Sequence, residues 1–159
     1  MRFYCDLSST AGLDVVTLNT SPPVKSTTAS VSSLTASLTG LVFDPTPAFN
    51  PTPTDRVFYA TSTQQNAIYQ FDPTAGTTTT YKVGINPYSL GFNFQTGTLL
   101  TINSTSNTSS IVDSQSLKST QTLGISSQSQ FAVAVDNWFN TAVIADQNNN
   151  RVLFLALPK

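Results

Sequence analysis

The sequence predicts an all-β protein in which a unit of four short antiparallel strands is repeated along the chain. All eight acidic residues are Asp, which favours turns, and the chain has no Glu, which favours helices. The 25 Thr and 20 Ser residues, together with 10 Phe and 5 Tyr, favour strands joined by polar turns. A pattern of apolar runs also recurs at intervals of about 40 to 50 residues, which indicates an internal repeat.

Length and charge limit the classes of protein to which the chain can belong. A chain of 159 residues is long enough for one domain with a sizeable core. Its net charge is −1, so it lacks the basic field that attracts nucleic acid or an anionic membrane. No stretch approaches the roughly 20 apolar residues of a membrane span. Cys5 is the sole cysteine, which excludes an internal disulfide, and we expect it to be a small core residue.

The first strand of each full unit is an apolar run that ends in Asp or Asn. These runs are residues 41–44 (LVFD), 90–93 (LGFN) and 133–136 (VAVD). Phe43, Phe92 and Val135 occupy the same position in the three runs, separated by 49 and 43 residues. We expect these three side chains to be buried and structurally equivalent.

Further apolar runs follow the first strand in the same order in each unit. The second runs are residues 57–60, 99–102 and 142–145, and the third runs are 67–71, 109–112 and 151–155. An amide precedes each third run, as Asn66, Asn107 or Asn150. The first two full units also have a fourth, Thr-rich run, at 77–83 and 116–123. A partial unit comes before them, with runs at 3–6, 15–18 and 25–31 that match the second to fourth runs.

Four short strands in every 40 to 50 residues is the period of a β-propeller blade. A β-sandwich also has many short strands, but it has no reason to repeat the same four runs with the same turn residues. We therefore predict a β-propeller-like array that is incomplete, with blades at residues 1–38 (partial), 39–85, 86–128 and 129–159 (partial). The apolar strand 151–157 is then an exposed edge through which the chain can self-associate, and we expect the chain to be a piece of a longer protein.

Two segments resemble the NHL-type and YVTN-type propeller repeats. The segment 84–90 (GINPYSL) resembles the connection between blades in these propellers. The segment 143–152 (VIADQNNNRV) resembles the NHL strand–turn–strand signature, in which an Asp precedes an Asn-rich turn and an Arg follows it. We expect Asp146 and Arg151 to pair at the surface across this turn, and Asn149 to have a positive φ. The resemblance extends over residues 41–159 and implies the fold but no single activity, because propellers host enzymes, binding scaffolds and structural proteins.

The residues that most catalytic and metal sites need are absent or scattered. The chain has no His, and its Asp residues show no Asp-x-Asp spacing. It therefore offers neither a His general base nor a His-containing zinc site, and it has little to hold calcium. No Gly-rich phosphate loop is present either. We predict a protein that is not an enzyme and that uses no cofactor or metal.

The sequence favours a noncatalytic β-propeller module that acts as an extracytoplasmic scaffold or recognition surface for a neutral polar partner, either a glycan or a protein. The low charge and the abundance of Ser, Thr and Asn are typical of an extracellular or cell-surface protein, although no signal peptide is visible in the sequence. We expect the amide-rich loops to share one face. The candidate binding residues are Gln64, Gln65, Asn66, Asn107, Asn148, Asn149 and Trp138. For Trp138, we expect packing against the neighbouring blade, and a role as an exposed binding anchor is the alternative. The alternative function is a fragment of a propeller enzyme, of the lyase or hydrolase type, whose catalytic residues lie in missing blades.

Overall fold

The protein is built almost entirely from short strands. The computed structural model describes the backbone of residues 2–6, 12–17, 24–30, 38–44, 57–72, 77–116, 118–124 and 130–158, and the side chains of 38–44, 57, 59–72, 77–116, 118 and 132–158. The strands are β1 (Arg2–Asp6), β2 (Gly12–Thr17), β3 (Val24–Ser30), β4 (Leu38–Phe43), β5 (Phe58–Ser62), β6 (Ala67–Asp72), β7 (Thr77–Lys82), β8 (Pro87–Asn93), β9 (Thr98–Asn103), β10 (Thr108–Asp113), β11 (Ser119–Gly124), β12 (Gln130–Asp136), β13 (Thr141–Asp146) and β14 (Arg151–Ala156). In the described ranges, the only helical segment is the short 3-10 turn η2 (Gln147–Asn149).

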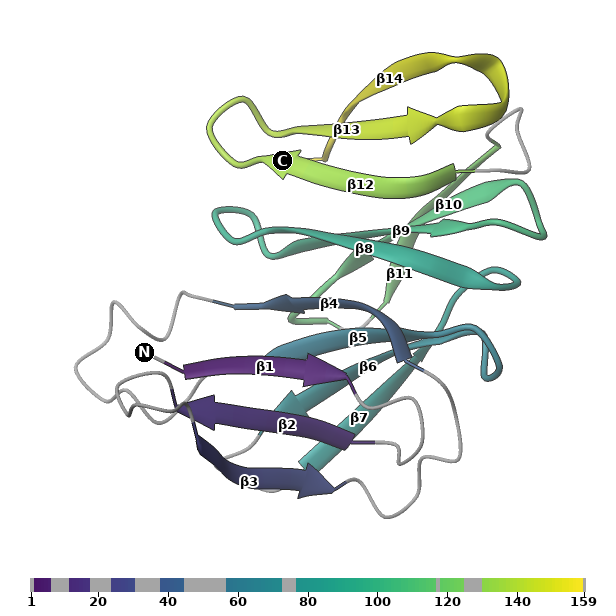
Figure 1. The fold of residues 1–159 in the computed structure, drawn as a ribbon. Helices are drawn as coiled ribbons and strands as arrows, with labels where there is room; N and C mark the ends of the chain where they lie inside the picture. Colours follow the sequence, from purple (N-terminus) through teal and green to yellow (C-terminus); the bar gives the residue numbers. More distant parts are fainter. Residues whose placement is uncertain are drawn as a thin grey trace.

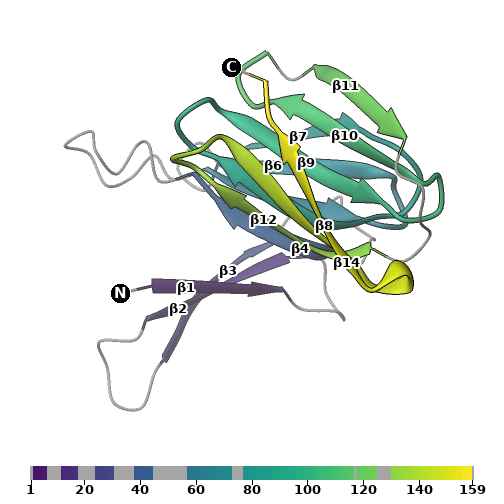
Figure 2. The same ribbon diagram turned by 90° about the horizontal axis from the view of Figure 1, so that it is seen from above.

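The strands form four antiparallel sheets, each made from strands that are consecutive in the chain. The sheets are β1-β2-β3, β4-β5-β6-β7, β8-β9-β10-β11 and β12-β13-β14. Figure 1 shows them stacked as successive layers, from the N-terminal sheet at the bottom to the C-terminal sheet at the top. Figure 2, the view from above, shows that the last three sheets overlie one another. This arrangement confirms the all-β, repeated architecture that the sequence predicts.

The first strands of the last three sheets lie side by side and form the inner edge of the stack. Strand β8 packs against both β4 and β12. After each outer strand, β7 or β11, the chain returns to the inner strand of the next sheet. By the same order, β3 is the outer strand of the first sheet because it leads into β4. Within the described ranges, the first sheet therefore has no inner strand equivalent to β4, β8 and β12.

In the described residues, the core includes two apolar layers between neighbouring sheets. One layer lies between the second and third sheets and is built around Tyr59, Ile68, Tyr81, Leu90, Phe92, Leu99 and Val112. The other lies between the third and fourth sheets and is built around Leu100, Ile102, Ile111, Ala142, Ile144 and Leu157. Adjacent residues of a strand point to opposite faces, so Leu99 enters the first layer and Leu100 the second. Strand β9 is consequently buried at every position.

The expectation that Phe43, Phe92 and Val135 are equivalent and buried is only partly correct. Their positions in the strands are equivalent, since Phe43 pairs with Phe58 and Phe92 pairs with Leu99 in the same register of the first and second strands. Phe92 is buried and Val135 is half-buried, but Phe43 is 53% exposed. Phe92 points toward the preceding sheet, where it packs on Tyr59. Phe43 points the same way, toward the first sheet, which within the described ranges has no inner strand to cover it.

Asn residues in the left-handed region mark the repeated turns. Asn66, Asn107 and Asn150 have φ of 52°, 53° and 48°, and each directly precedes the third strand of its sheet. Asn tolerates this conformation better than other non-glycine residues. The expected positive φ at Asn149 is wrong by one residue, because Asn149 lies inside the 3-10 turn and Asn150 is the residue that closes it.

Candidate functional site

Six of the seven candidate residues lie at one end of the sheets. Gln64, Gln65 and Asn66 are in the turn between β5 and β6, and Asn107 closes the turn between β9 and β10. Asn148 and Asn149 are in η2, between β13 and β14. Because these turns join the second and third strands of successive sheets, they lie at the same end of the stack, on the right in Figure 1. We call this end the amide end.

The side chains of Asn66 and Asn86 make hydrogen bonds within the fold. The Oδ1 atom of Asn66 accepts a hydrogen bond from the Asn86 backbone N–H at 2.8 Å. The Nδ2 atom of Asn86 donates in turn to the Ser104 hydroxyl at 2.6 Å. The connection between the second and third sheets is thus fastened to a turn in each of them. The side-chain amide of Asn66 therefore helps to position neighbouring blades, and its Oδ1 atom is less available to bind a partner.

Asp146 and Arg151 form the ion pair that the sequence predicts, but not at the surface. Arg151 Nε donates to Asp146 Oδ2 at 2.7 Å, and the Asp146 side chain is fully buried. Asn149 Nδ2 also donates to both carboxylate oxygens, at 3.1 and 2.9 Å. A buried carboxylate must be paired and hydrogen-bonded to be tolerated. Asn149 and Arg151 therefore hold the turn together, and a hollow of about 270 Å³ beside it is lined by Asp146 and Arg151 themselves.

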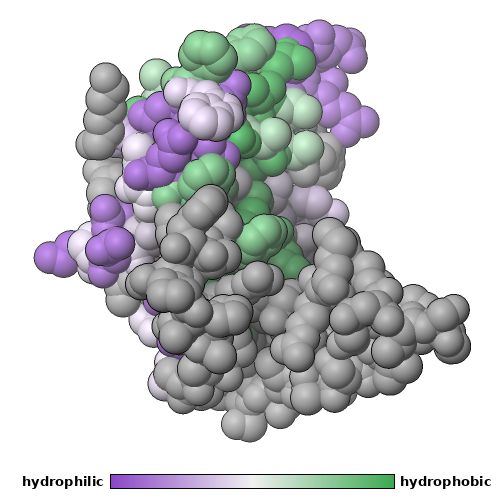
Figure 3. Space-filling model, turned by 90° about the vertical axis from the view of Figure 1, so that its left-hand side faces the viewer, coloured by the Kyte–Doolittle hydropathy of each residue, from purple (hydrophilic) through white to green (hydrophobic). Residues whose placement is uncertain are grey.

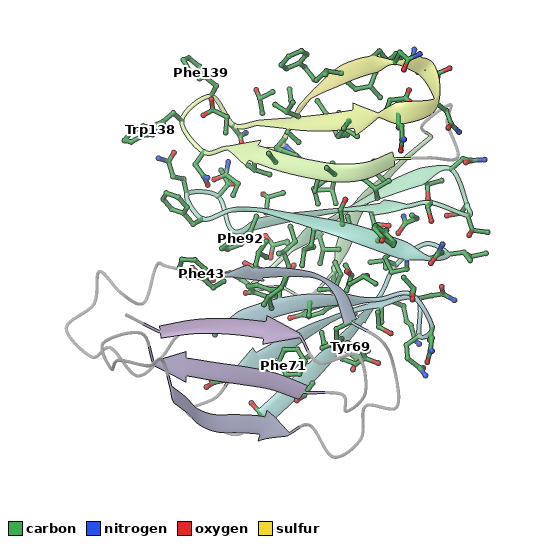
Figure 4. All side chains as sticks on the ribbon, viewed as in Figure 1. Phe43, Tyr69, Phe71, Phe92, Trp138 and Phe139 are labelled. Atoms are coloured by element: carbon green, nitrogen blue, oxygen red, sulfur yellow. The ribbon has the colours of Figure 1, made fainter. Side chains whose placement is uncertain are left out.

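Trp138 lies at the opposite end of the sheets from the six amides. It is in the turn between β12 and β13, together with Phe139. Trp138 is 85% exposed and Phe139 is 80% exposed. Figure 4 shows both side chains projecting from the tip of the last sheet, on the left of the molecule. The seven candidates therefore do not form one surface, and packing of Trp138 against a neighbouring blade of this chain is also wrong.

Hydrogen bonds hold the turn that carries the two aromatic side chains, residues 137–140. The Asp136 carboxylate accepts hydrogen bonds from the backbone N–H groups of Trp138 and Phe139, at 2.9 and 3.1 Å. Such a turn is a common arrangement for Asp after a strand. Asn137 Oδ1 accepts from the backbone N–H of Phe94 in the preceding sheet, at 2.9 Å. We call residues 137–140 the aromatic turn.

Asn140 connects the aromatic turn to two other parts of the chain. Its φ is 51°, and its Oδ1 atom accepts from Asn93 Nδ2 at 2.6 Å. Its Nδ2 atom donates to the Leu157 carbonyl at 2.7 Å, and the Leu157 N–H donates back to the Asn140 carbonyl at 2.9 Å. The turn is thereby tied to the third sheet and to the segment after β14. Trp138 and Phe139 are exposed on a backbone that has little freedom to move.

The equivalent turn of the preceding sheet is exposed at the position of Trp138 even though another sheet packs beside it. Gln95 occupies the place of Trp138 in the turn between β8 and β9, since 43 residues separate the two. Gln95 is exposed although the last sheet packs beside its own sheet. A further blade would therefore not by itself cover Trp138.

An apolar groove runs along the inner strands. It has a volume of about 570 Å³, and its lining comes from β4, β8, β12 and the turn after β8. The lining residues are Leu41, Val42, Phe43, Leu90, Gly91, Phe92, Phe94, Val133, Ala134 and Val135. Seen from the end that carries the aromatic turn, hydrophobic side chains form a band over the described part of the molecule (Figure 3). With no polar side chain in its lining, this axial groove offers no group for acid–base or nucleophilic chemistry.

Besides the Asp146 carboxylate, the buried ionisable groups in the described residues are tyrosines, and burial raises their pKa values. Burial raises the pKa of Tyr81 well above its usual value, and the nearby Tyr59 hydroxyl raises it further. The Tyr81 hydroxyl donates to Gln70 Oε1 at 2.6 Å, which gives it a neutral partner. Two backbone N–H groups that donate to Asp113 lower the pKa of its carboxyl, those of Ser116 and Gln115. These shifts accompany packing and turn formation, and none of these groups faces the axial groove.

Neither a metal site nor a membrane-spanning helix is found in the described residues. Across these residues, no three His, Cys, Asp or Glu side chains cluster closely enough to hold a metal ion. In the same part of the chain, no helix has the length and apolar character needed to cross a membrane.

Comparison with solved structures identifies the architecture. The chain is similar to the crystal structure of the WD40 β-propeller domain of Doa1, with a TM-score of 0.75 and 13% identity over 99% of this chain and 47% of that chain. It is also similar to a chain of the nidogen/laminin complex, with a TM-score of 0.65 and 13% identity over 95% of this chain and 54% of that chain. The protein folds as an open arc of a β-propeller. It spans about half the length of both of these chains.

Comparison of sequences adds no family assignment. No family model matches the chain, and no curated protein matches it. The solved structures therefore support the propeller fold, with the four sheets as its blades, and the NHL or YVTN repeat type belongs to the proposal below.

Proposed function

We propose that this propeller arc is a noncatalytic recognition module of the NHL or YVTN type that binds a neutral glycan at the cell exterior through its aromatic turn. The exposed pair of Trp138 and Phe139 is the observation that carries the proposal. Aromatic side chains supply large contact areas, and Trp is enriched where binding energy is concentrated. Hydrogen bonds to the Asp136 carboxylate and from the Asn140 side-chain amide hold the turn before any partner arrives, so little entropy is lost on binding.

The surroundings of the aromatic turn suit a neutral polar ligand. Gln95, in the equivalent turn of the neighbouring blade, places an exposed amide at the same end of the stack. The whole chain carries only seven basic and eight acidic residues, so it exerts little long-range attraction on a charged partner. An aromatic surface with nearby amides can pack on the apolar face of a sugar ring and hydrogen-bond its hydroxyls.

Binding to a neutral glycan can be tested with a panel of immobilised neutral oligosaccharides. We expect wild-type protein to bind at least one of them, and the double variant Trp138→Ala/Phe139→Ala to lose that binding. The matched control is Gln64→Ala/Gln65→Ala, which changes two exposed residues at the amide end and should bind normally. If the control loses binding and the aromatic variant keeps it, the amide end is the recognition surface and our assignment is wrong.

A protein partner is the second candidate. It is favoured by the similarity to a chain of the nidogen/laminin complex, a complex between two proteins. Absence of binding to every oligosaccharide, with capture of a purified protein that depends on Trp138, would replace the glycan by a protein. The enzyme alternative rests on residues outside this sequence. A longer reading frame with His or carboxylate clusters at matching blade positions would favour it over a binding module.

A further inference from the structure

The turn between β8 and β9 has the same construction as the aromatic turn. In the aromatic turn, the carboxylate at the end of β12 accepts two backbone N–H groups. The Asn93 Oδ1 atom at the end of β8 likewise accepts the N–H groups of Gln95 and of the residue after it, at 2.9 and 3.4 Å. Each turn then closes on a residue with positive φ, Gly97 at 68° or Asn140 at 51°. Gln95 and Trp138 therefore occupy equivalent positions on two turns of the same kind.

Direct hydrogen bonds hold these two turns side by side. Asn137 Oδ1 accepts from the Phe94 backbone N–H at 2.9 Å. The side-chain amide that begins the β8–β9 turn also donates to the one that ends the aromatic turn, at 2.6 Å. Gln95 and Trp138 each come directly after one partner of the first bond, and both are exposed. In Figure 4, Trp138 lies below Phe139 and thus nearer to the third blade. Packed sheets are about 10 Å apart, so a ligand with one ring flat on Trp138 reaches Gln95 with a neighbouring ring.

The end of the stack that carries these turns is acidic among the side chains that the structure describes. The first and third strands of each full blade end here, because neighbouring strands are antiparallel. Asp44, Asp72, Asp113 and Asp136 lie at the ends of such strands. Lys118, just before β11, is the one basic side chain described at this end. A sugar that carries a carboxylate or sulfate group is therefore repelled, whereas the hydroxyls of a neutral sugar can donate to carboxylates and amides.

We propose that the aromatic turn and the β8–β9 turn form one site, the two-turn site, for an uncharged oligosaccharide of at least two units. One sugar ring packs on Trp138, and a neighbouring unit hydrogen-bonds to the Gln95 side chain, whose amide both donates and accepts. The oligosaccharide then runs across the two blades, from one turn to the next. This inference rests on the proposed glycan function and narrows it, because a single sugar ring on Trp138 leaves Gln95 unused.

Calorimetric titration of the full 159-residue chain tests the two-turn site. The probes are glucose, mannose and N-acetylglucosamine, and their disaccharides maltose, cellobiose, mannobiose and diacetylchitobiose. We expect at least one disaccharide to bind about tenfold more tightly than its monosaccharide, because it adds a hydrogen bond at Gln95. Gln95→Ala should remove this gain and leave binding of the monosaccharide unchanged. The matched control is Gln65→Ala, which changes an exposed glutamine at the amide end and should keep the gain.

Several results would overturn the two-turn site and leave the glycan function of the aromatic turn in place. These are equal affinities for monosaccharide and disaccharide, a Gln95→Ala variant that keeps the gain, and a Gln95→Ala variant that binds the monosaccharide more weakly, since one ring would then contact both turns. Absence of binding to all of these probes would also overturn the site. Absence of binding across the wider oligosaccharide panel would overturn the glycan function as well.

The charge of the ligand is tested with a disaccharide in which one ring is a uronic acid. We expect it to bind more weakly than its neutral counterpart, and added salt should narrow the difference by screening the carboxylates at this end of the stack. Tighter binding of the acidic disaccharide would overturn the assignment of an uncharged ligand.

Discussion

Replacing Asn107 with Val is expected to lower the free energy of unfolding by about 1–3 kcal/mol. Asn107 closes the turn between β9 and β10 with φ of 53°, a region that a β-branched residue adopts only with strain. The side chain contributes little else, because in the described part of the structure its Oδ1 atom has no hydrogen-bond partner. Nearly all of the loss should therefore come from the backbone conformation.

Thermal unfolding followed by circular dichroism measures this loss. For a chain of this size each kcal/mol shifts the midpoint by about 2–4 °C. Asn107→Gly is the matched control, since Gly adopts positive φ without strain, and it should unfold close to wild type. Asn66→Gly should cost about 0.5–1.5 kcal/mol, because Asn66 Oδ1 accepts from the Asn86 N–H. Equal midpoints for the Val and Gly variants at position 107 would refute the assignment of a left-handed turn there.

Two further predictions concern the packing of the blades. Gly91→Val should destabilise the protein by about 1–3 kcal/mol, since a Cβ at Gly91 would lie 2.7 Å from Val135 Cγ2 on the next inner strand; an unchanged urea midpoint would show that the inner strands are not in contact. Tyr81 has a pKa raised in the folded state, so its contribution to stability is complete below about pH 10 and is lost as the pH rises toward the folded-state pKa. Tyr81→Phe should therefore lose less stability than wild type between neutral pH and about pH 11, and a steeper loss in the variant would contradict this.

The repeated pattern of the sequence was sufficient to predict the sheets but not the surroundings of individual side chains. Apolar runs and their turn residues are local features, and they identify strands such as β9 directly. The exposure of Phe43 depends on its neighbour, because the described strands of the first blade include no inner strand, and the run that contains Phe43 does not reveal this. The separation of Trp138 from the amides could have been found, because a turn between the first and second strands must lie opposite a turn between the second and third.

The internal uses of the amides were beyond sequence reasoning for a different reason. Asn66 and Asn149 look alike in the chain, as polar residues of amide-rich turns. Their roles differ because Asn66 receives a backbone N–H from a neighbouring connection and Asn149 donates to a buried carboxylate. Both partners are fixed only once the blades are stacked.

The burial of β9 on both sides has a consequence for how the arc opens. Leu99 belongs to one interblade layer and Leu100 to the other, so this strand cannot detach without disrupting both layers. Amide hydrogens paired within β9 should exchange with solvent only when the whole arc unfolds, whereas those of β14, with a blade on one side only, can exchange through local opening. The third blade is then the slowest-exchanging part of the chain, and the two layers that meet at its second strand unfold as a single cooperative unit.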